Sequence, residues 1–192
     1  MQTAASASLT FTRSLQASGL ATKAAAVVIG SLLISAATQV EVPMAPVPMT
    51  MQTFAVLAVG VLYGGRLGAL TVVAYLLQGA VGLPVFSGGA NLAMLIAKPF
   101  TAGYLVGFVA AAFIAGWFAE RGAGLGRVVL GVSLGSVAIY AFGLPWLAFM
   151  LGGDVSKAIA VGAVPFLLGD AIKAALAVAV REGVGRISLA RR

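Results

Sequence analysis

The feature that most constrains this chain is a series of six long apolar stretches separated by short polar or Gly- and Pro-rich breaks. Of its 192 residues, 61% are hydrophobic and 9% charged, whereas soluble domains are about half apolar and a quarter charged. This number of charges is too small to cover the surface of a soluble fold of this length. The chain is therefore expected to be all-α and embedded in lipid. The stretches are residues 24–40, 51–63, 67–81, 100–119, 128–147 and 159–180.

The number of membrane spans depends on the second and third stretches. A spanning helix needs on the order of 20 apolar residues, and these two are shorter, with only Gly64, Gly65 and Arg66 between them. They can therefore be interpreted as two spans or as one kinked helix over residues 54–81.

Charge placement decides between six spans and five, because cytoplasmic loops are enriched in Lys and Arg. Six spans with a cytoplasmic N-terminus place nine cations on one side and two on the other, whereas five spans give four against six. We therefore predict six spans with both termini cytoplasmic. The nine are Arg13, Lys23, Arg66, Arg121, Arg127, Arg181, Arg186, Arg191 and Arg192, and the two are Lys98 and Lys157.

The expected organisation is one transmembrane domain over residues 23–182, between a cytoplasmic tail at 1–22 and a basic cytoplasmic tail at 183–192. The first tail is rich in Ser, Thr and Ala and is expected to fray or to lie along the membrane face. Lys23, the apolar run after it and Ser35-Ala36-Ala37 resemble a cleavable secretion signal. Five further spans follow, which favours a membrane anchor.

Several functions are excluded by what the sequence lacks. It has no Cys and no His, which removes thiolate and imidazole catalysis and most zinc sites. It has no Walker phosphate loop, and only Asp170 and Glu41 could supply acidic ligands to an outer metal site. Its excess of cations flanks apolar segments, which fits lipid headgroups better than nucleic acid. We predict a solute-binding membrane protein without cofactor or metal that is not an enzyme.

The most informative residues are Asp170 and Lys173 in the last stretch. An ionisable side chain at a helix centre costs roughly 2.5–3.5 kcal/mol and usually faces a partner or a cavity. These two lie three residues apart and share one helix face. Two interpretations remain open, namely mutual neutralisation with a structural role only, or a polar pocket that contacts a solute.

The two predicted outer loops carry further candidates. Residues 39–53 contain three prolines and are mostly apolar, with Thr50 and Gln52 as hydrogen-bonding groups. Such a stiff segment either covers a site or is an ordinary interfacial connector. In the second loop, Asn91 offers a donor and an acceptor that suit an amide-like group. Lys98 either lies near the pocket or extends to lipid headgroups.

Small residues recur at a spacing of four in the first stretch. Ala21 and Ala25 form one such pair, and Thr22, Ala26 and Gly30 form another row. Small residues let helices approach closely in lipid. Two roles are open for each row: packing within the bundle, or docking of another membrane subunit.

Three motifs in order along the chain resemble the BioY family. They are Val-Pro-Met-Thr-Met-Gln-Thr-Phe-Ala-Val-Leu at 47–57, Gly-Ala-Val-Gly-Leu-Pro-Val-Phe-Ser-Gly-Gly at 79–89, and Pro99 with Gly-Tyr-Leu-Val-Gly-Phe at 103–108. Gly169-Asp170 with Lys173 fits the same family. This is a family of biotin-binding S-components of energy-coupling factor (ECF) transporters. The resemblance implies an S-component bundle with both termini inside, and high-affinity uptake of biotin across the bacterial cytoplasmic membrane.

The resemblance also implies roles for particular residues. By motif position, Asn91, Asp170 and Lys173 resemble the family's ligand contacts, with Asn91 and Asp170 suited to the ureido ring and Lys173 to the valerate carboxylate. Lys98 departs from the small residue expected before the proline. Ala21 and Ala25 match the Ala-x-x-x-Ala face that meets the transmembrane coupling subunit, which works with a pair of ATPases.

Two alternative functions remain at this stage. The first is an S-component for a different vitamin, although thiamine would prefer aromatic and acidic contacts that the outer loops offer sparsely. The second is a stand-alone transporter, which predicts ionisable residues on several helices rather than mainly on one.

Overall fold

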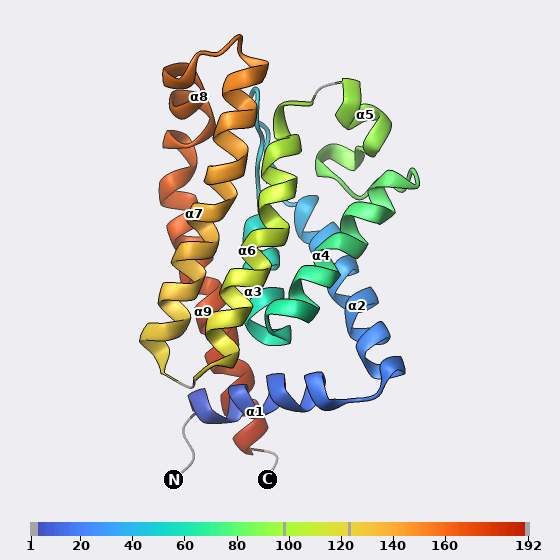
Figure 1. The fold of residues 1–192 in the computed structure, drawn as a ribbon, viewed down its shortest axis with the longest axis vertical. Coiled ribbons are helices and arrows are strands. Elements are labelled where there is room, and N and C mark those ends of the chain that lie inside the picture. The colour runs from blue at the N-terminus through green and yellow to red at the C-terminus, as the bar shows by residue number, and fades with distance from the viewer. Residues whose placement is uncertain (1–3, 98, 123, 191–192) are drawn as a thin grey trace.

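The computed structural model describes residues 4–97, 99–122 and 124–190, so Lys98 lies outside the described part. Helices form nearly all of it, joined by one two-residue β ladder and three short 3₁₀ turns (Figure 1). In order, the elements are α1 (Ala4–Ala17), α2 (Leu20–Thr38), β1 (Glu41–Val42), β2 (Met49–Thr50), α3 (Gln52–Tyr63), α4 (Gly65–Ala80), η1 (Ser87–Gly89), α5 (Leu92–Ala97), η2 (Pro99–Thr101), α6 (Ala102–Glu120), α7 (Leu125–Met150), α8 (Val155–Gly162), η3 (Val164–Phe166) and α9 (Leu167–Ala190).

Four helical segments in the described residues are long and apolar enough to cross a membrane. They are Leu20–Thr38, Pro99–Glu120, Leu125–Met150 and Val155–Ile187, and a shorter apolar helix covers Gln52–Tyr63. The described part is therefore all-helical, as predicted, and holds four candidate spans where the sequence predicts six.

The second and third apolar stretches form two separate helices. The break lies at Gly64, whose φ of +84° belongs to the left-handed region that only glycine adopts without strain. Its N–H still donates to the carbonyl of Gly60 at 2.9 Å, which closes α3, and α4 starts at the next residue. A continuous helix over residues 54–81 does not form.

Glycines allow the central helices to cross closely. A Cβ added at Gly60 of α3 would lie 2.7 Å from the carbonyl oxygen of Ala112 in α6, and one added at Gly107 would lie 2.9 Å from Cα of Ile139 in α7. Both are closer than real Cβ contacts. Backbone-to-backbone packing of this kind is how helices associate in lipid, where no hydrophobic driving force acts between them.

α1 runs across the end of the bundle where both termini lie (Figure 1). Thr12 donates to the carbonyl of Leu62 at 3.0 Å, and Gln16 donates to the carbonyl of Tyr63 at 3.2 Å. These bonds fasten α1 beneath the end of α3. The described part of the predicted N-terminal tail is thus helical except at residues 18–19, and residues 183–190 of the predicted C-terminal tail continue α9.

At the other end of the bundle, the proline-rich first loop folds back as a short hairpin. β1 pairs antiparallel with β2, and Glu41 lies opposite Thr50. Below it, Gln52 donates to the buried hydroxyl of Tyr75 at 2.8 Å, and Tyr75 donates to the carbonyl of Val85 at 3.1 Å. The start of α3 is thereby tied through α4 to the second loop.

Candidate substrate-binding site

A pocket opens under the first loop, between α3, α6, α7 and α9. The empty space among its lining residues is about 630 Å³, which includes the part open to solvent. The lining residues are Val47, Pro48, Thr50, Gln52, Thr53, Phe86, Ser87, Thr101, Tyr104, Leu105, Phe108, Ile139, Tyr140, Gly162, Phe166, Asp170 and Lys173.

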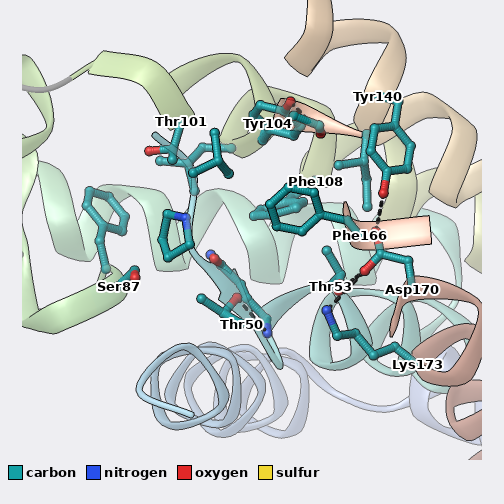
Figure 2. Close-up of a pocket in the computed structure, with 17 residues that line it drawn as sticks. Thr50, Thr53, Ser87, Thr101, Tyr104, Phe108, Tyr140, Phe166, Asp170 and Lys173 are labelled. Atoms are coloured by element: carbon teal, nitrogen blue, oxygen red, sulfur yellow. Dashed lines mark hydrogen bonds and ion pairs between the residues drawn. The ribbon is translucent and has the colours of Figure 1, made fainter. Parts of the chain in front are cut away.

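The carboxylate of Asp170 accepts hydrogen bonds from three other side chains in the polar part of this pocket (Figure 2). Its Oδ1 accepts hydrogen bonds from Lys173 Nζ at 3.0 Å and from Thr53 Oγ1 at 3.3 Å, and its Oδ2 accepts one from the Tyr140 hydroxyl at 2.5 Å. The donors come from α9, α3 and α7. Three helices therefore orient one carboxylate toward the pocket.

The Asp170–Lys173 pair is mostly buried, with side-chain exposures of 16% and 7%. Both residues nevertheless line the cavity. The pair thus neutralises itself and also lines the pocket, so the geometry is compatible with both interpretations of the sequence. A buried ion pair costs desolvation energy that its Coulomb attraction does not always repay, which points to a functional reason for placing it here.

The remaining wall of the pocket is largely apolar and aromatic. Tyr104 and Phe108 of α6 and Phe166 of η3 surround the space beside Asp170 (Figure 2). The Tyr104 hydroxyl donates to the carbonyl of Gly162 at 2.8 Å, so it braces α6 against α8. The pocket suits a small solute with a polar group at one end and an apolar body.

Thr50 and Gln52, the two hydrogen-bonding candidates of the first loop, also line the pocket. Their hydrogen bonds are partly internal: Thr50 Oγ1 accepts from the backbone N–H of Gln52 at 3.1 Å, while the Gln52 amide donates to Tyr75. The two residues therefore shape the rim where the hairpin meets α3.

Asn91 lies apart from the described residues that line the pocket. Its Oδ1 accepts from the backbone N–H of Met94 at 3.3 Å, and its Nδ2 donates to the carbonyl of Gly82 at 3.2 Å. Asparagine is a preferred N-cap residue, and here it begins α5. Lys98, outside the described residues, has no structural account.

Sequence reasoning missed the hydroxyls of Tyr140 and Thr53 and the aromatic wall. A signal for Tyr140 exists, because a tyrosine in the middle of an apolar span needs a hydrogen-bond partner. Thr53 stands within the first-loop motif but was not distinguished from its neighbours.

The structure separates the two rows of small residues in α2. Ala26 and Gly30 are buried, and a Cβ added at Gly30 would lie 2.7 Å from Thr71 Cγ2 and 2.9 Å from Tyr63 Cε2. Ala21 and Ala25 are exposed. The row with Gly30 thus packs inside this chain, and the row with Ala25 faces outward.

Comparison with known proteins identifies the family. The model described as "BioY family" matches residues 4–189. The chain belongs to the BioY family.

Curated BioY relatives cover most of the chain. The biotin transporter BioY of Rhizobium etli is 41% identical over 148 residues, which are 72% of this chain and 78% of the relative. The probable biotin transporter BioY of Pyrococcus horikoshii is 40% identical over 151 residues, 78% and 88% of the two chains. The biotin transporter BioY of Thermotoga maritima is 36% identical over 163 residues, 85% and 95%.

A solved structure shares the fold. It is the crystal structure of the S-component for biotin from an ECF-type ABC transporter, with a TM-score of 0.76 and 24% identity over 88% of this chain and 95% of the other. The predicted S-component-like fold is therefore confirmed. As a BioY-family member, the chain is a multi-pass membrane protein of a transporter family and not an enzyme.

Proposed function

We propose that this chain captures biotin and takes it up across the bacterial cytoplasmic membrane as the S-component of an ECF-type transporter. The observation that carries the proposal is the buried Asp170–Lys173 pair beside an open pocket in a BioY-family chain. The choice of biotin as the substrate rests on the relatives that are named as biotin transporters.

The geometry favours one orientation of biotin. Lys173 Nζ lies 3.0 Å from Asp170 Oδ1, so both groups act at the same end of the pocket. The ureido ring presents an N–H beside a carbonyl, so Asp170 accepts from the N–H and Lys173 donates to the carbonyl. The valerate carboxylate, at the far end of an extended biotin, then points away from this pair. This arrangement revises the expectation that Lys173 binds the carboxylate.

The proposed topology has six spans with residues 1–22 and 183–192 on the cytoplasmic side. The separate α3 and α4 helices, the common end of the two termini in Figure 1 and the nine-to-two division of cations all support it. The pocket then opens to the exterior, where a capture subunit needs it.

Release to the cytoplasm needs a transmembrane coupling subunit and a pair of ATPases, because this sequence has no phosphate loop. The exposed Ala21–Ala25 face of α2 is the proposed docking surface. Ala25→Trp should preserve biotin binding and impair energised uptake, while Leu77→Trp on the exposed face of α4 should preserve both. Loss of binding in Ala25→Trp would favour a role in internal packing.

Equilibrium binding of labelled biotin to the purified protein tests the function, with unlabelled thiamine and riboflavin as competitors. We expect saturable binding in the micromolar range or tighter that neither competitor displaces. Displacement by thiamine or riboflavin at similar concentrations would support an S-component for another vitamin. The absence of saturable biotin binding would overturn the proposal.

A further inference from the structure

A second cavity lies at the end of the bundle that carries the termini, between α1, α2, α4 and α6. Its empty space is about 1040 Å³, compared with about 630 Å³ in the first pocket, and both values include the part open to solvent. Three cations and one carboxylate stand in its lining, so positive charge is in excess. The lining residues are Gln16, Lys23, Arg66, Leu67, Leu70, Phe113, Trp117, Glu120 and Arg121.

The one carboxylate of this cavity is already engaged. Glu120 Oε2 accepts from Gln16 Nε2 at 2.7 Å and from the backbone N–H of Gly65 at 3.2 Å, and Oε1 lies 3.6 Å from Arg121 Nη1. Arg121 in turn stacks over the ring of Trp117, with Cζ 3.6 Å from the ring centre. Glu120 thus connects α1, α4 and α6, and its negative charge can neutralise only the neighbouring Arg121.

Lys23 and Arg66 remain uncompensated. Within the part of the chain that the structure describes, neither side chain has a hydrogen-bond or ion-pair partner. Both face a shared cavity, so their charges repel each other there and favour an anion between them. The arrangement is therefore complementary to a phosphate group.

The cavity also has an apolar side that faces away from the protein. Leu70, Phe113 and Trp117 are 54%, 41% and 37% exposed. Two of them lie on α6, a candidate membrane span. A free anion would occupy only the basic part and leave these side chains uncovered. A phospholipid matches both parts, because its phosphate is anionic and its acyl chains are apolar.

We propose that this cavity binds an anionic phospholipid of the membrane, with its phosphate between Lys23 and Arg66 and its acyl chains along Phe113 and Leu70. This site is separate from the biotin pocket, and its occupancy does not depend on the biotin assignment.

Quenching of Trp117 by brominated lipids measures this binding directly. The sequence has two tryptophans, and Trp146→Phe leaves Trp117 alone as the reporter. The full-length variant is placed in phosphatidylcholine vesicles that contain equal fractions of either dibrominated phosphatidylglycerol or dibrominated phosphatidylcholine. We expect the anionic lipid to quench at least threefold more strongly than the zwitterionic lipid.

Matched variants assign the effect to this cavity. In the same background, Lys23→Gln together with Arg66→Gln should reduce the quenching ratio to about one, whereas Arg13→Gln, an exposed cation of α1 outside the lining, should preserve it. A thermal unfolding midpoint equal to that of the parent reports that each variant is folded. A ratio of one in the parent, or an unchanged ratio in the double variant, would overturn the proposal.

Two further measurements separate the lipid from other anions. Millimolar glycerol phosphate at constant ionic strength should leave quenching unchanged; full reversal would identify a soluble phosphate as the ligand and overturn the lipid assignment. The same measurement on the assembled transporter should retain the anionic preference. Its complete loss there would assign the cavity to an acidic protein partner and would also contradict the proposal.

Discussion

Lys173 Nζ lies 3.0 Å from Oδ1 of Asp170, one helical turn earlier in α9, and both side chains are mostly buried. Thr53 and Tyr140 complete the hydrogen bonding of the same carboxylate. The charge on Asp170 is thus held in place by three helices before any ligand arrives. Such preorganisation lowers the cost of ordering the site on binding.

Removing single members of this cluster should weaken biotin binding in a graded way. Asp170→Asn and Lys173→Ala should each raise the Kd for biotin at least tenfold, about 1.4 kcal/mol, because each change removes one of the two contacts proposed for the ureido ring. Tyr140→Phe removes only one hydrogen bond to the carboxylate and should cost less than Asp170→Asn. Calorimetric titration measures all three. Affinities within about twofold of the parent for both charge variants would contradict the assignment.

The orientation of biotin can be tested with its carboxamide. If Lys173 donates to the ureido carbonyl, Lys173→Ala should weaken biotin and biotinamide by the same factor, because neither contact involves the valerate group. If Lys173 binds the carboxylate, the factor should fall to about one for the amide. The comparison is a thermodynamic cycle, so global effects of the substitution cancel.

A contact between the first and second loops should control the rate of biotin release. The Ser87 hydroxyl donates to Oε2 of Glu41 in β1, and both loops contribute to the lining or cover of the pocket. Ser87→Ala removes this tie. Biotin dissociation should accelerate about threefold to tenfold, consistent with a bond worth about 1 kcal/mol, while association changes little.

The matched control for this experiment is Ser156→Ala, an exposed serine of α8 outside the lining. It should leave both rates unchanged. Chase experiments with excess unlabelled biotin measure dissociation. Equal dissociation rates for Ser87→Ala and the parent would show that the loop contact does not hold the cover.

The fully buried Arg181 should contribute more to stability than any exposed arginine. Its guanidinium donates to the carbonyl of Ala119 at 3.2 Å and lies 3.3 Å from Glu182 Oε1, so it links α9 to the end of α6. Arg181→Lys keeps the charge but cannot reproduce this planar set of donors. We expect a loss of about 2 kcal/mol and a Tm lower by roughly 4–8 °C.

Arg186→Lys on the same helix is the control for Arg181, because Arg186 is exposed. Thermal unfolding in detergent should show no shift for this variant. Similar Tm shifts for the two substitutions would mean that the burial of Arg181 does not contribute to the stability of the protein.

Much of the fold follows from the apolar pattern, because lipid leaves a buried backbone few alternatives to the helix. Residues 100–119 and 128–147 correspond closely to α6 and α7. Helix breaks that depend on local backbone geometry could not be predicted from apolarity. The helix of α8 is separated from α9 by the turn around Pro165, whereas apolarity alone runs continuously through residues 159–180.

The site was partly predictable for a similar reason. Asp170 and Lys173 are costly in lipid, so a single sequence draws attention to them. Tyr140 does not stand out within an apolar stretch of the sequence. Only the packing of α7 beside α9 shows that its hydroxyl donates to Asp170. Asn91 has the right chemistry for a ligand contact, but its side chain serves the first turn of α5 in this structure.

Ligand protection of one engineered cysteine tests the central claim, that biotin occupies the pocket beside Asp170. The sequence has no cysteine, so Thr101→Cys places a single thiol in the lining and Ser156→Cys places one on exposed α8. We predict that saturating biotin slows maleimide modification of Thr101→Cys at least tenfold and leaves Ser156→Cys unchanged. An unchanged rate at Thr101→Cys, in a protein that demonstrably binds biotin, would place the vitamin elsewhere and contradict the account.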